Sequence, residues 1–256
     1  VVNPKMILKE LEKELIKKGV IILKDEKKIK FFPCEKSISL TKSKINYGHL
    51  INCSGLEASQ IAHKFGVGKH LFIIPFKGIY WQIRKNSSIK ISTNVYPVPD
   101  LNMPFLGVHF TPDANPSNEI SIGPTATFAF GRENYKYLEG IEIFRSIRNL
   151  ATISKLYLAN NGGFRGYVHN QSLQNFKFIM IKEAKKIIPK ISLNHIEPSE
   201  KVGIRAQLYN SSLNKFEDDF ICMNGYHSTH LMNSISPAFT SSFSLADLVL
   251  QKSGLI

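Results

Sequence analysis

Hydrophobic positions in the first 70 residues indicate helices alternating with strands. Residues 5–18 (KMILKELEKELIKK) place their apolar side chains on one helical face, with Pro4 and Gly19 suited to the two ends of the helix. After this helix the pattern predicts a buried strand at 20–23, a short hairpin at 28–45, another buried strand at 49–53 and a helix at about 57–65.

Residues 71–123 have a different pattern. Apolar runs rich in β-branched and aromatic residues alternate with proline-containing turns, which is typical of a sheet. The remaining elements are predicted as helices at 139–160 and 172–189, strands at 203–209, 218–223 and 228–232, and a closing helix at about 240–251. This order predicts an α/β (α+β) protein, in which residues 1–70 and 200–256 form a discontinuous domain and residues 71–199 an inserted mixed-sheet domain.

Composition narrows the classes of function. The 256 residues are 43% hydrophobic, enough for a substantial core, and no apolar stretch approaches the length of a membrane span. The formal net charge is +13, but the lysines are spread among acidic residues, without a zinc-ligand set or an RNP-like motif. We therefore expect a solvated basic surface and no nucleic-acid partner, while attraction to an acidic membrane face or an anionic substrate stays open.

The cysteines indicate the redox compartment, and the first residues indicate whether the sequence is part of a longer protein. Cys34, Cys53 and Cys222 are far apart and form no CxxC pair. Their hydrophobic neighbours predict small core residues in a reducing compartment, with neither disulfides nor a metal site. The start Val1-Val2-Asn3-Pro4 lacks an initiator Met and a signal-peptide pattern, so we expect a segment of a longer protein.

A polar turn between the strand at 228–232 and the closing helix is the first candidate for a binding site. It consists of small and polar residues: Asn233, Ser234, Ser236, Pro237, Ala238 and Thr240. The free N–H groups at the start of such a helix favour an anionic group. An ordinary helix N-cap explains the same pattern, since Ser and Thr are preferred capping residues.

Other candidate residues lie on or after predicted strands. Asn52 and Gly55 lie at the end of a strand, where glycine permits either close approach of a ligand or a tight turn. His109 lies on an apolar strand, where it is either a hydrogen-bonded core residue or a base. Arg205 lies on another, and its planar fork suits a substrate carboxylate as well as a salt bridge to the acidic pair at 218–219.

Several motifs occur in the order found in one flavoprotein family: PFKGIYW, VYPVPD, PFLGVHFT, IGPTATFAFGRENY, GIRAQ, DDFI and NSISPAFTSS. From about Val1 to Leu250 the chain resembles the L-2-hydroxyglutarate dehydrogenase/oxidase family, a branch of the D-amino-acid-oxidase-like flavoproteins. Residues 139–195 are the least distinctive part. The resemblance implies an FAD-binding α/β domain, here incomplete and discontinuous, and a substrate domain built on a mixed sheet.

In such enzymes a hydride leaves the hydroxyl-bearing carbon for the flavin while a base takes the hydroxyl proton. The resemblance implies His109 as the group for proton transfer and Arg205 as the clamp for the substrate carboxylate. It also implies a substrate site lined by Lys77, Tyr80 and Tyr96. The implied flavin contacts, made largely through backbone N–H groups, are Arg205, Asn52, Gly55, Asn233, Ser234, Ser236, Pro237, Ala238 and Thr240.

The sequence departs from the family pattern in places. Lys77 stands where the family usually has Arg, so a bidentate contact becomes a point charge. Ile235 and Phe239 stand where it usually has Pro and Ala, and Phe239 is bulky for a loop that a flavin approaches. The G-x-G-x-x-G turn that holds the ADP half of FAD does not occur in residues 1–256. We therefore expect these residues alone to bind FAD weakly or not at all.

The resemblance predicts an FAD-dependent enzyme that oxidises a small 2-hydroxy acid, with L-2-hydroxyglutarate as the expected substrate and 2-oxoglutarate as the product. The alternatives are a related flavoprotein acting on an amino acid or a glycerol phosphate, and a non-catalytic remnant without the nucleotide-binding half. The electron acceptor, oxygen or a quinone, stays open. The expected location is the cytoplasm, or the mitochondrion in a eukaryote, with peripheral association with the inner membrane open.

Overall fold

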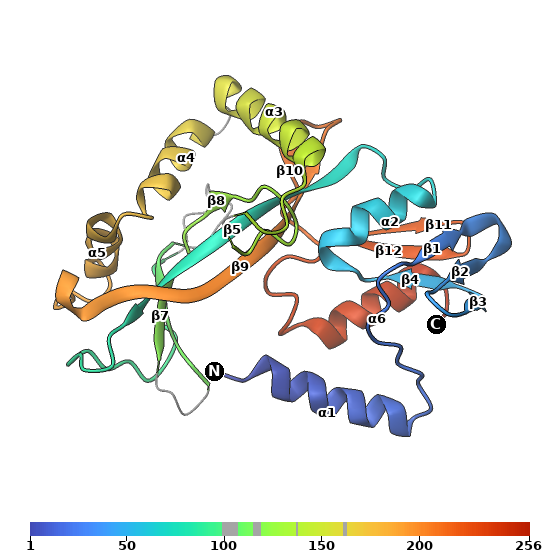
Figure 1. Ribbon diagram of the computed structural model, residues 1–256, viewed down its shortest axis with the longest axis horizontal. Helices are drawn as coiled ribbons and strands as arrows, with labels where there is room; N and C mark the ends of the chain where they lie inside the picture. The colour runs from blue at the N-terminus through green and yellow to red at the C-terminus, as the bar shows by residue number, and fades with distance from the viewer. Residues whose placement is uncertain (99–106, 115–118, 137, 161–162) are drawn as a thin grey trace. The chain divides into compact units, whose positions relative to one another are not determined.

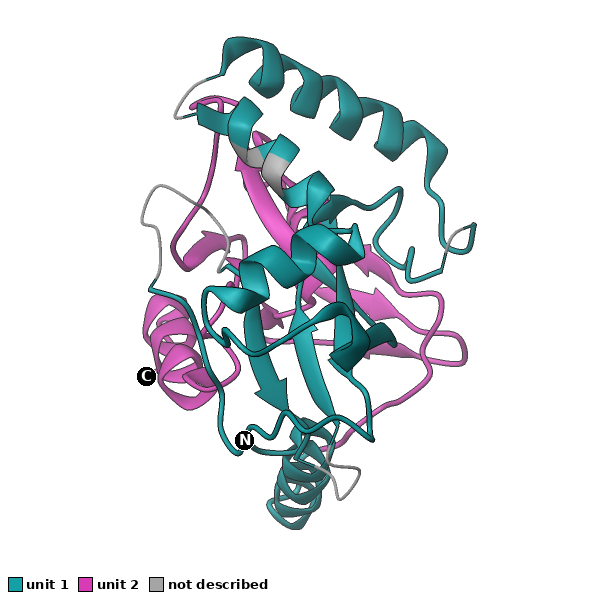
Figure 2. Ribbon diagram, turned by 90° about the vertical axis from the view of Figure 1, so that its left-hand side faces the viewer, with its two compact units in different colours: residues 1–20, 76–205 teal, residues 21–75, 206–256 magenta. Residues whose placement is uncertain are grey.

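The computed structural model describes residues 1–98, 107–114, 119–136, 138–160 and 163–256 (Figure 1). The chain divides into two compact units (Figure 2): unit 1 comprises residues 1–20 and 76–205, and unit 2 comprises residues 21–75 and 206–256. Two long strands, β5 (Leu71–Ile83) and β9 (Ile196–Asn210), contribute residues to both units. The predicted mixed α/β class is confirmed, and the predicted 1–70 segment is divided because residues 1–20 group with unit 1.

Unit 2 contains a sheet with a helix on each face (Figure 1). In this sheet β11 (Ile221–Gly225) pairs antiparallel with β12 (Ser228–Asn233), which pairs parallel with β4 (Leu50–Asn52). Met232 packs with Ala62 of α2 (Ala58–Lys64), whereas Leu231 packs with Leu245 of α6 (Ser242–Ser253). Neighbouring residues of a strand point to opposite faces, so β12 supplies both helix-packing layers.

The remaining strands of unit 2 are short. β1 (Lys30–Phe32), β2 (Ser37–Ser39) and β3 (Lys44–Asn46) form an antiparallel meander where a hairpin was predicted. The 3-10 turn η1 (Pro33–Glu35) lies between β1 and β2, and the 3-10 turn η2 (Gly55–Glu57) lies directly before α2. The strand β10 (Lys215–Phe216) pairs with the end of β9.

Unit 1 is built on the strands β9, β5, β7 (Ile120–Gly123) and β6 (His109–Pro112), in that order across the sheet, with β8 (Thr127–Phe128) paired to β5. One face carries the core, where Ile83, Phe110 and Ile122 pack with Met180 of α5 (Lys177–Lys185). Trp81 packs against this core from the same face. Because side chains alternate along a strand, the residues between these core positions point to the opposite face.

The helices of unit 1 follow the predicted order with one change. α1 (Pro4–Lys17) and α3 (Ile143–Ala159) confirm two predicted helices. α5 lies within the helix predicted at 172–189, whereas α4 (Phe164–Leu173) lies almost entirely before that range. The short turn η4 (Leu193–His195) follows α5. α4 ends at Leu173, and Phe176, the N-cap residue of α5, has extended backbone angles (φ −81°, ψ 129°), so the two helices are not continuous.

Three predictions of burial are wrong. Residues 20–23 form no strand, and Ile21 is 84% exposed. β4 is buried only in part, since Ile51 is 39% exposed. Cys34 and Cys53 are exposed and Cys222 is half-buried, so they are not core residues. These predictions came from apolar composition alone, whereas burial also needs a packing surface on the other side.

Among the described residues, no helix combines the length and the apolar character that crossing a bilayer requires.

Candidate active site

A polar cluster lies on the face of the unit 1 sheet that α5 leaves uncovered. It consists of Tyr80 on β5, His109 on β6, Lys201 and Arg205 on β9, and Tyr96 in the segment before β6. Besides burial, the charges of Arg205 and Lys201 both lower the pKa of His109. Burial raises the pKa of Tyr80, Arg205 lowers it and Tyr96 raises it. The structure thus brings together four residues that the sequence predicted from separate motifs, and adds Lys201.

A glycine sits between Tyr80 and His109. His109 pairs with Gly123 across β6 and β7, and the neighbouring pair Trp81–Ile122 places Tyr80 opposite the same glycine. A Cβ atom on Gly123 would lie 3.3 Å from Cδ1 of Tyr80, and its φ of +137° is also one that side-chain-bearing residues rarely adopt. Glycine at this position therefore lets the Tyr80 ring extend across β7 toward His109.

His109 is held in one tautomer. Its Nδ1–H donates a hydrogen bond to the carbonyl oxygen of Gly107 at 3.0 Å, so Nε2 carries the lone pair. The ring of Tyr96 lies 4.6 Å from the His109 ring at an angle of 31°. Burial lowers the pKa of His109, and the charges of Arg205 and Lys201 lower it further, while the bond to Gly107 opposes the shift. His109 is therefore neutral near pH 7 and able to accept a proton at Nε2.

Lys201 was missed in the sequence because lysine is abundant throughout the chain. Its Nζ lies 4.7 Å from the centre of the Tyr80 ring, in cation–π geometry. The signal that could have found it is the spacing in KVGIRAQ: on a strand, Lys201 and Arg205 are four residues apart and share a face.

Burial raises the pKa of Tyr80, with Arg205 opposing the shift, so its hydroxyl stays protonated at neutral pH.

Lys77, the fifth residue predicted to line the substrate site, is not brought to the cluster. It lies three positions before Tyr80 on β5, and alternation along the strand places it on the face of Trp81 and Ile83. Burial lowers the pKa of its ammonium group.

The two asparagines predicted as cofactor residues lie in unit 2 and have partners within the chain. Asn52 donates from Nδ2 to Ala58 O at 2.9 Å and to His230 Nδ1 at 3.0 Å. Asn233 is buried and donates from Nδ2 to the carbonyl oxygen of Asp219 at 2.7 Å. Asn52 thus links β4 to β12, and Asn233 links β12 to the segment before β11.

The turn ahead of α6 also lies in unit 2. Ser234, Ser236, Pro237 and Thr240 are exposed, while Ala238 is half-buried against the α6 core. The hydroxyl groups of Thr240 and Ser241 both donate to the carbonyl oxygen of Pro237 at 3.0 Å. They cap no N–H group, and α6 begins without a side-chain cap.

Gly55, ahead of α2, also leaves its backbone uncovered. It has a φ of +57°, and a Cβ built on it would have nothing within 4 Å. An uncapped helix start and a bare backbone are features that suit an anionic ligand bound through N–H groups, such as a flavin. The residues present therefore fit the cofactor that the resemblance implies.

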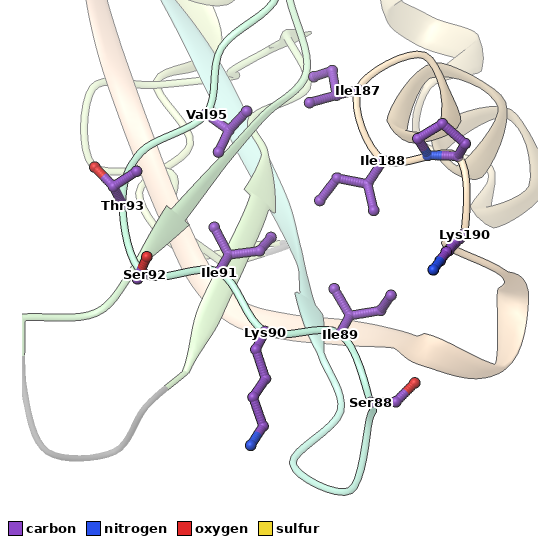
Figure 3. A pocket seen from close by; sticks show the side chains of 11 residues that line it. Ser88, Ile89, Lys90, Ile91, Ser92, Thr93, Val95, Ile187, Ile188 and Lys190 are labelled. Carbon is purple, nitrogen blue, oxygen red and sulfur yellow. The ribbon is translucent and has the colours of Figure 1, made fainter.

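A pocket of about 620 Å³ lies elsewhere in unit 1, lined by residues of the segments 88–95 and 187–190 (Figure 3). Its floor is apolar and continuous with the core through Ile89, Val95 and Ile188, and its charged groups are Lys90 and Lys190. It holds no residue of the polar cluster and no acid or base suited to proton transfer near neutral pH. The lining of this pocket therefore offers no group for the proton transfer that the resemblance implies.

Known proteins match nearly the whole chain. A family model described as FAD dependent oxidoreductase matches residues 1–251. The chain is 32% identical over 225 residues to the mitochondrial L-2-hydroxyglutarate dehydrogenase of Nematostella vectensis, covering 84% of this chain and 47% of that protein. It is 30% identical over 211 residues to the L-2-hydroxyglutarate dehydrogenase of Escherichia coli (strain K12), covering 79% and 47%. The chain thus spans about half the length of the curated relatives it matches.

A solved structure supports the fold. The dithionite-reduced L-alpha-glycerophosphate oxidase from Mycoplasma pneumoniae with FAD bound superposes with a TM-score of 0.51, covering 90% of this chain and 50% of that chain. The sequence identity is 13%, so this likeness bears on the fold alone.

Proposed function

Because the chain belongs to the FAD-dependent oxidoreductase family, we propose that it supplies the substrate site, and part of the cofactor site, of an enzyme that oxidises a small 2-hydroxy acid. The proposed substrate is L-2-hydroxyglutarate and the proposed product is 2-oxoglutarate, the substrate class named in the relatives at about 30% identity.

The observation that carries the proposal is a neutral histidine beside two cations on one face of a sheet. A 2-hydroxy acid presents a carboxylate and a hydroxyl group on adjacent carbons. The guanidinium fork of Arg205 suits the carboxylate, and Nε2 of His109 suits the hydroxyl proton.

In the proposed reaction, the chain moves one proton and orients one carbon. The bond from His109 to Gly107 keeps the lone pair on Nε2, and the Tyr96 ring limits rotation of the imidazole. As the hydroxyl proton passes to Nε2, the C2–H electron pair leaves as hydride and the C2 carbonyl forms. When bound, FAD supplies the two-electron acceptor for this hydride. The charges of Lys201 and Arg205, which lower the pKa of His109, favour release of the proton after the reaction.

In unit 2, Gly55 and the turn from Ser234 to Thr240 are proposed to hold the cofactor through backbone N–H groups. Asn52 and Asn233 are proposed to shape this region through their bonds within the chain. Arg205 is proposed to serve the substrate carboxylate.

The acceptor that reoxidises the enzyme is proposed to be oxygen or a quinone, to be distinguished by oxygen uptake with and without added quinone. The relatives include a mitochondrial protein and a protein of Escherichia coli, and the proposed location is the cytoplasm, or the mitochondrion in a eukaryote.

The test is a substrate panel assayed with the FAD-loaded full-length protein and an artificial electron acceptor. We expect 2-oxoglutarate from L-2-hydroxyglutarate and little turnover of its D-enantiomer. Preferred turnover of glycine or of glycerol 3-phosphate would replace the substrate by that of an alternative flavoprotein class. No turnover of any substrate by protein with bound flavin would favour the non-catalytic remnant.

A further inference from the structure

One face of β9 carries two cations with a bare position between them. Lys201, Gly203 and Arg205 are at alternate positions, so their side-chain directions are the same. A Cβ built on Gly203 would meet nothing within 4 Å, so open space lies over the strand between the two charges. The Cα atoms of the cations are about 13 Å apart at the usual rise of a strand, and both side chains are long enough to reach toward each other.

Lys201 and Arg205 both interact with the rings of Tyr80 and His109. The ammonium of Lys201 lies 4.7 Å from the centre of the Tyr80 ring, and the charge of Arg205 also acts on Tyr80. Both charges act on His109. Lys201 therefore faces the same space as the proposed base and the proposed carboxylate clamp, although it is more exposed than either.

We propose that Lys201 is a specificity-determining residue that binds a second, distal carboxylate of the substrate, in the space that Gly203 leaves open. This inference rests on the proposed function, in which Arg205 holds the carboxylate beside the reacting carbon. The two cations suit the two carboxylates of the substrate. The planar fork of Arg205 fixes the orientation of the carboxylate beside the reacting carbon. The ammonium of Lys201, a point charge on a flexible stem, attracts a distal carboxylate whose orientation does not matter.

Lys77 is the rival for the distal carboxylate, because the sequence motif alone suggested it. The structure favours Lys201 because Lys77 shares the face of the core residue Ile83, whereas Lys201 contacts Tyr80 directly.

The experiment compares binding of glutarate and butyrate, two non-reacting acids that differ in the distal carboxylate, to the FAD-loaded full-length protein by calorimetry. We expect Lys201→Met to weaken glutarate binding at least tenfold and to leave butyrate binding nearly unchanged. Lys201→Arg keeps the charge and should retain most of the affinity for glutarate. Gly203→Val should weaken glutarate more than butyrate by filling the space. Lys90→Met, an exposed lysine at the apolar pocket, is the matched control and should change neither.

Equal losses for both acids in Lys201→Met, or a selective loss in Lys77→Met instead, would overturn the proposal. Thermal melts of each variant show whether the fold is kept. Steady-state turnover of L-2-hydroxyglutarate and L-2-hydroxypentanoate is measured in parallel. If neither is oxidised, the proposed reaction fails, while the binding comparison still decides whether a second carboxylate subsite exists at Lys201.

Discussion

Nδ2 of Asn52 donates a hydrogen bond to Nδ1 of His230 at 3.0 Å, and this bond links β4 to β12 inside unit 2. His230 is fully buried, and its Nε2 lies 3.0 Å from the hydroxyl oxygen of Ser228. Asn52 cannot present its oxygen to the imidazole without losing bonds, since Oδ1 already accepts from the backbone and the hydroxyl of Ser54. His230 is therefore a neutral imidazole with its proton on Nε2.

The buried, neutral His230 is expected to make the protein less stable in mild acid. Burial lowers the pKa of His230 from 6.5 to about 4, with a further contribution from His49. The unfolded chain then binds the proton first as the pH falls, so the contribution to stability is complete above about pH 6.5 and is lost on the way to pH 4. The loss amounts to at most about 3 kcal/mol.

Urea denaturation of wild type and His230→Gln at pH 7 and pH 4.5 measures this effect. The variant should be less stable at pH 7 but should lose less stability between the two values. An identical pH dependence in both proteins would show that His230 titrates normally.

Replacing His109 tests the proposed base. His109→Gln retains a side-chain N–H group for the Gly107 carbonyl but has no lone pair of comparable basicity, so kcat should fall by about 10²–10⁴. Because the pKa of His109 is lowered, the acid limb of the wild-type kcat/KM profile should lie below pH 6.5. The limb should disappear in the variant. An acid limb that persists unchanged in His109→Gln would assign it to another group.

Arg205→Lys keeps the charge of the proposed clamp but removes its fork geometry. We expect kcat/KM to fall by about 10²-fold, or about 2.7 kcal/mol of transition-state stabilisation, with an unchanged melting temperature. Arg84→Lys, an exposed arginine that follows β5, is the matched control and should have near-normal kinetics. A lowered melting temperature with normal turnover would instead assign Arg205 to a structural salt bridge.

Phe239, in the turn ahead of α6, is bulky for a loop that a flavin approaches. Its side chain is 45% exposed, so Phe239→Ala should not cost the 3–5 kcal/mol typical of a core phenylalanine. We expect a loss below about 1 kcal/mol and preserved or improved affinity for FAD. Thermal melts with and without FAD measure both quantities.

The sequence predicted individual residues of the polar cluster better than their grouping. Tyr80, His109 and Arg205 could be singled out from their motifs, but their meeting on one face depends on strand register, which pairs His109 with Gly123. Asn52 was assigned to the cofactor because it ends a strand. Its imidazole partner, 178 positions away, could not be read from local sequence.

Burial was the property least accessible from composition. The apolar run 20–23 has the residues of a buried strand, yet Ile21 is 84% exposed. Apolar composition states that a segment can be buried, whereas packing decides whether it is.

The proposed function is FAD-dependent oxidation of a 2-hydroxy acid at the polar cluster. Its most direct test is the anaerobic absorption spectrum of the FAD-loaded full-length protein during titration with L-2-hydroxyglutarate. We predict bleaching of the oxidised flavin band with formation of an equimolar amount of 2-oxoglutarate, and much slower bleaching in His109→Gln. An oxidised flavin spectrum that stays unchanged at saturating L-2-hydroxyglutarate would contradict the claim.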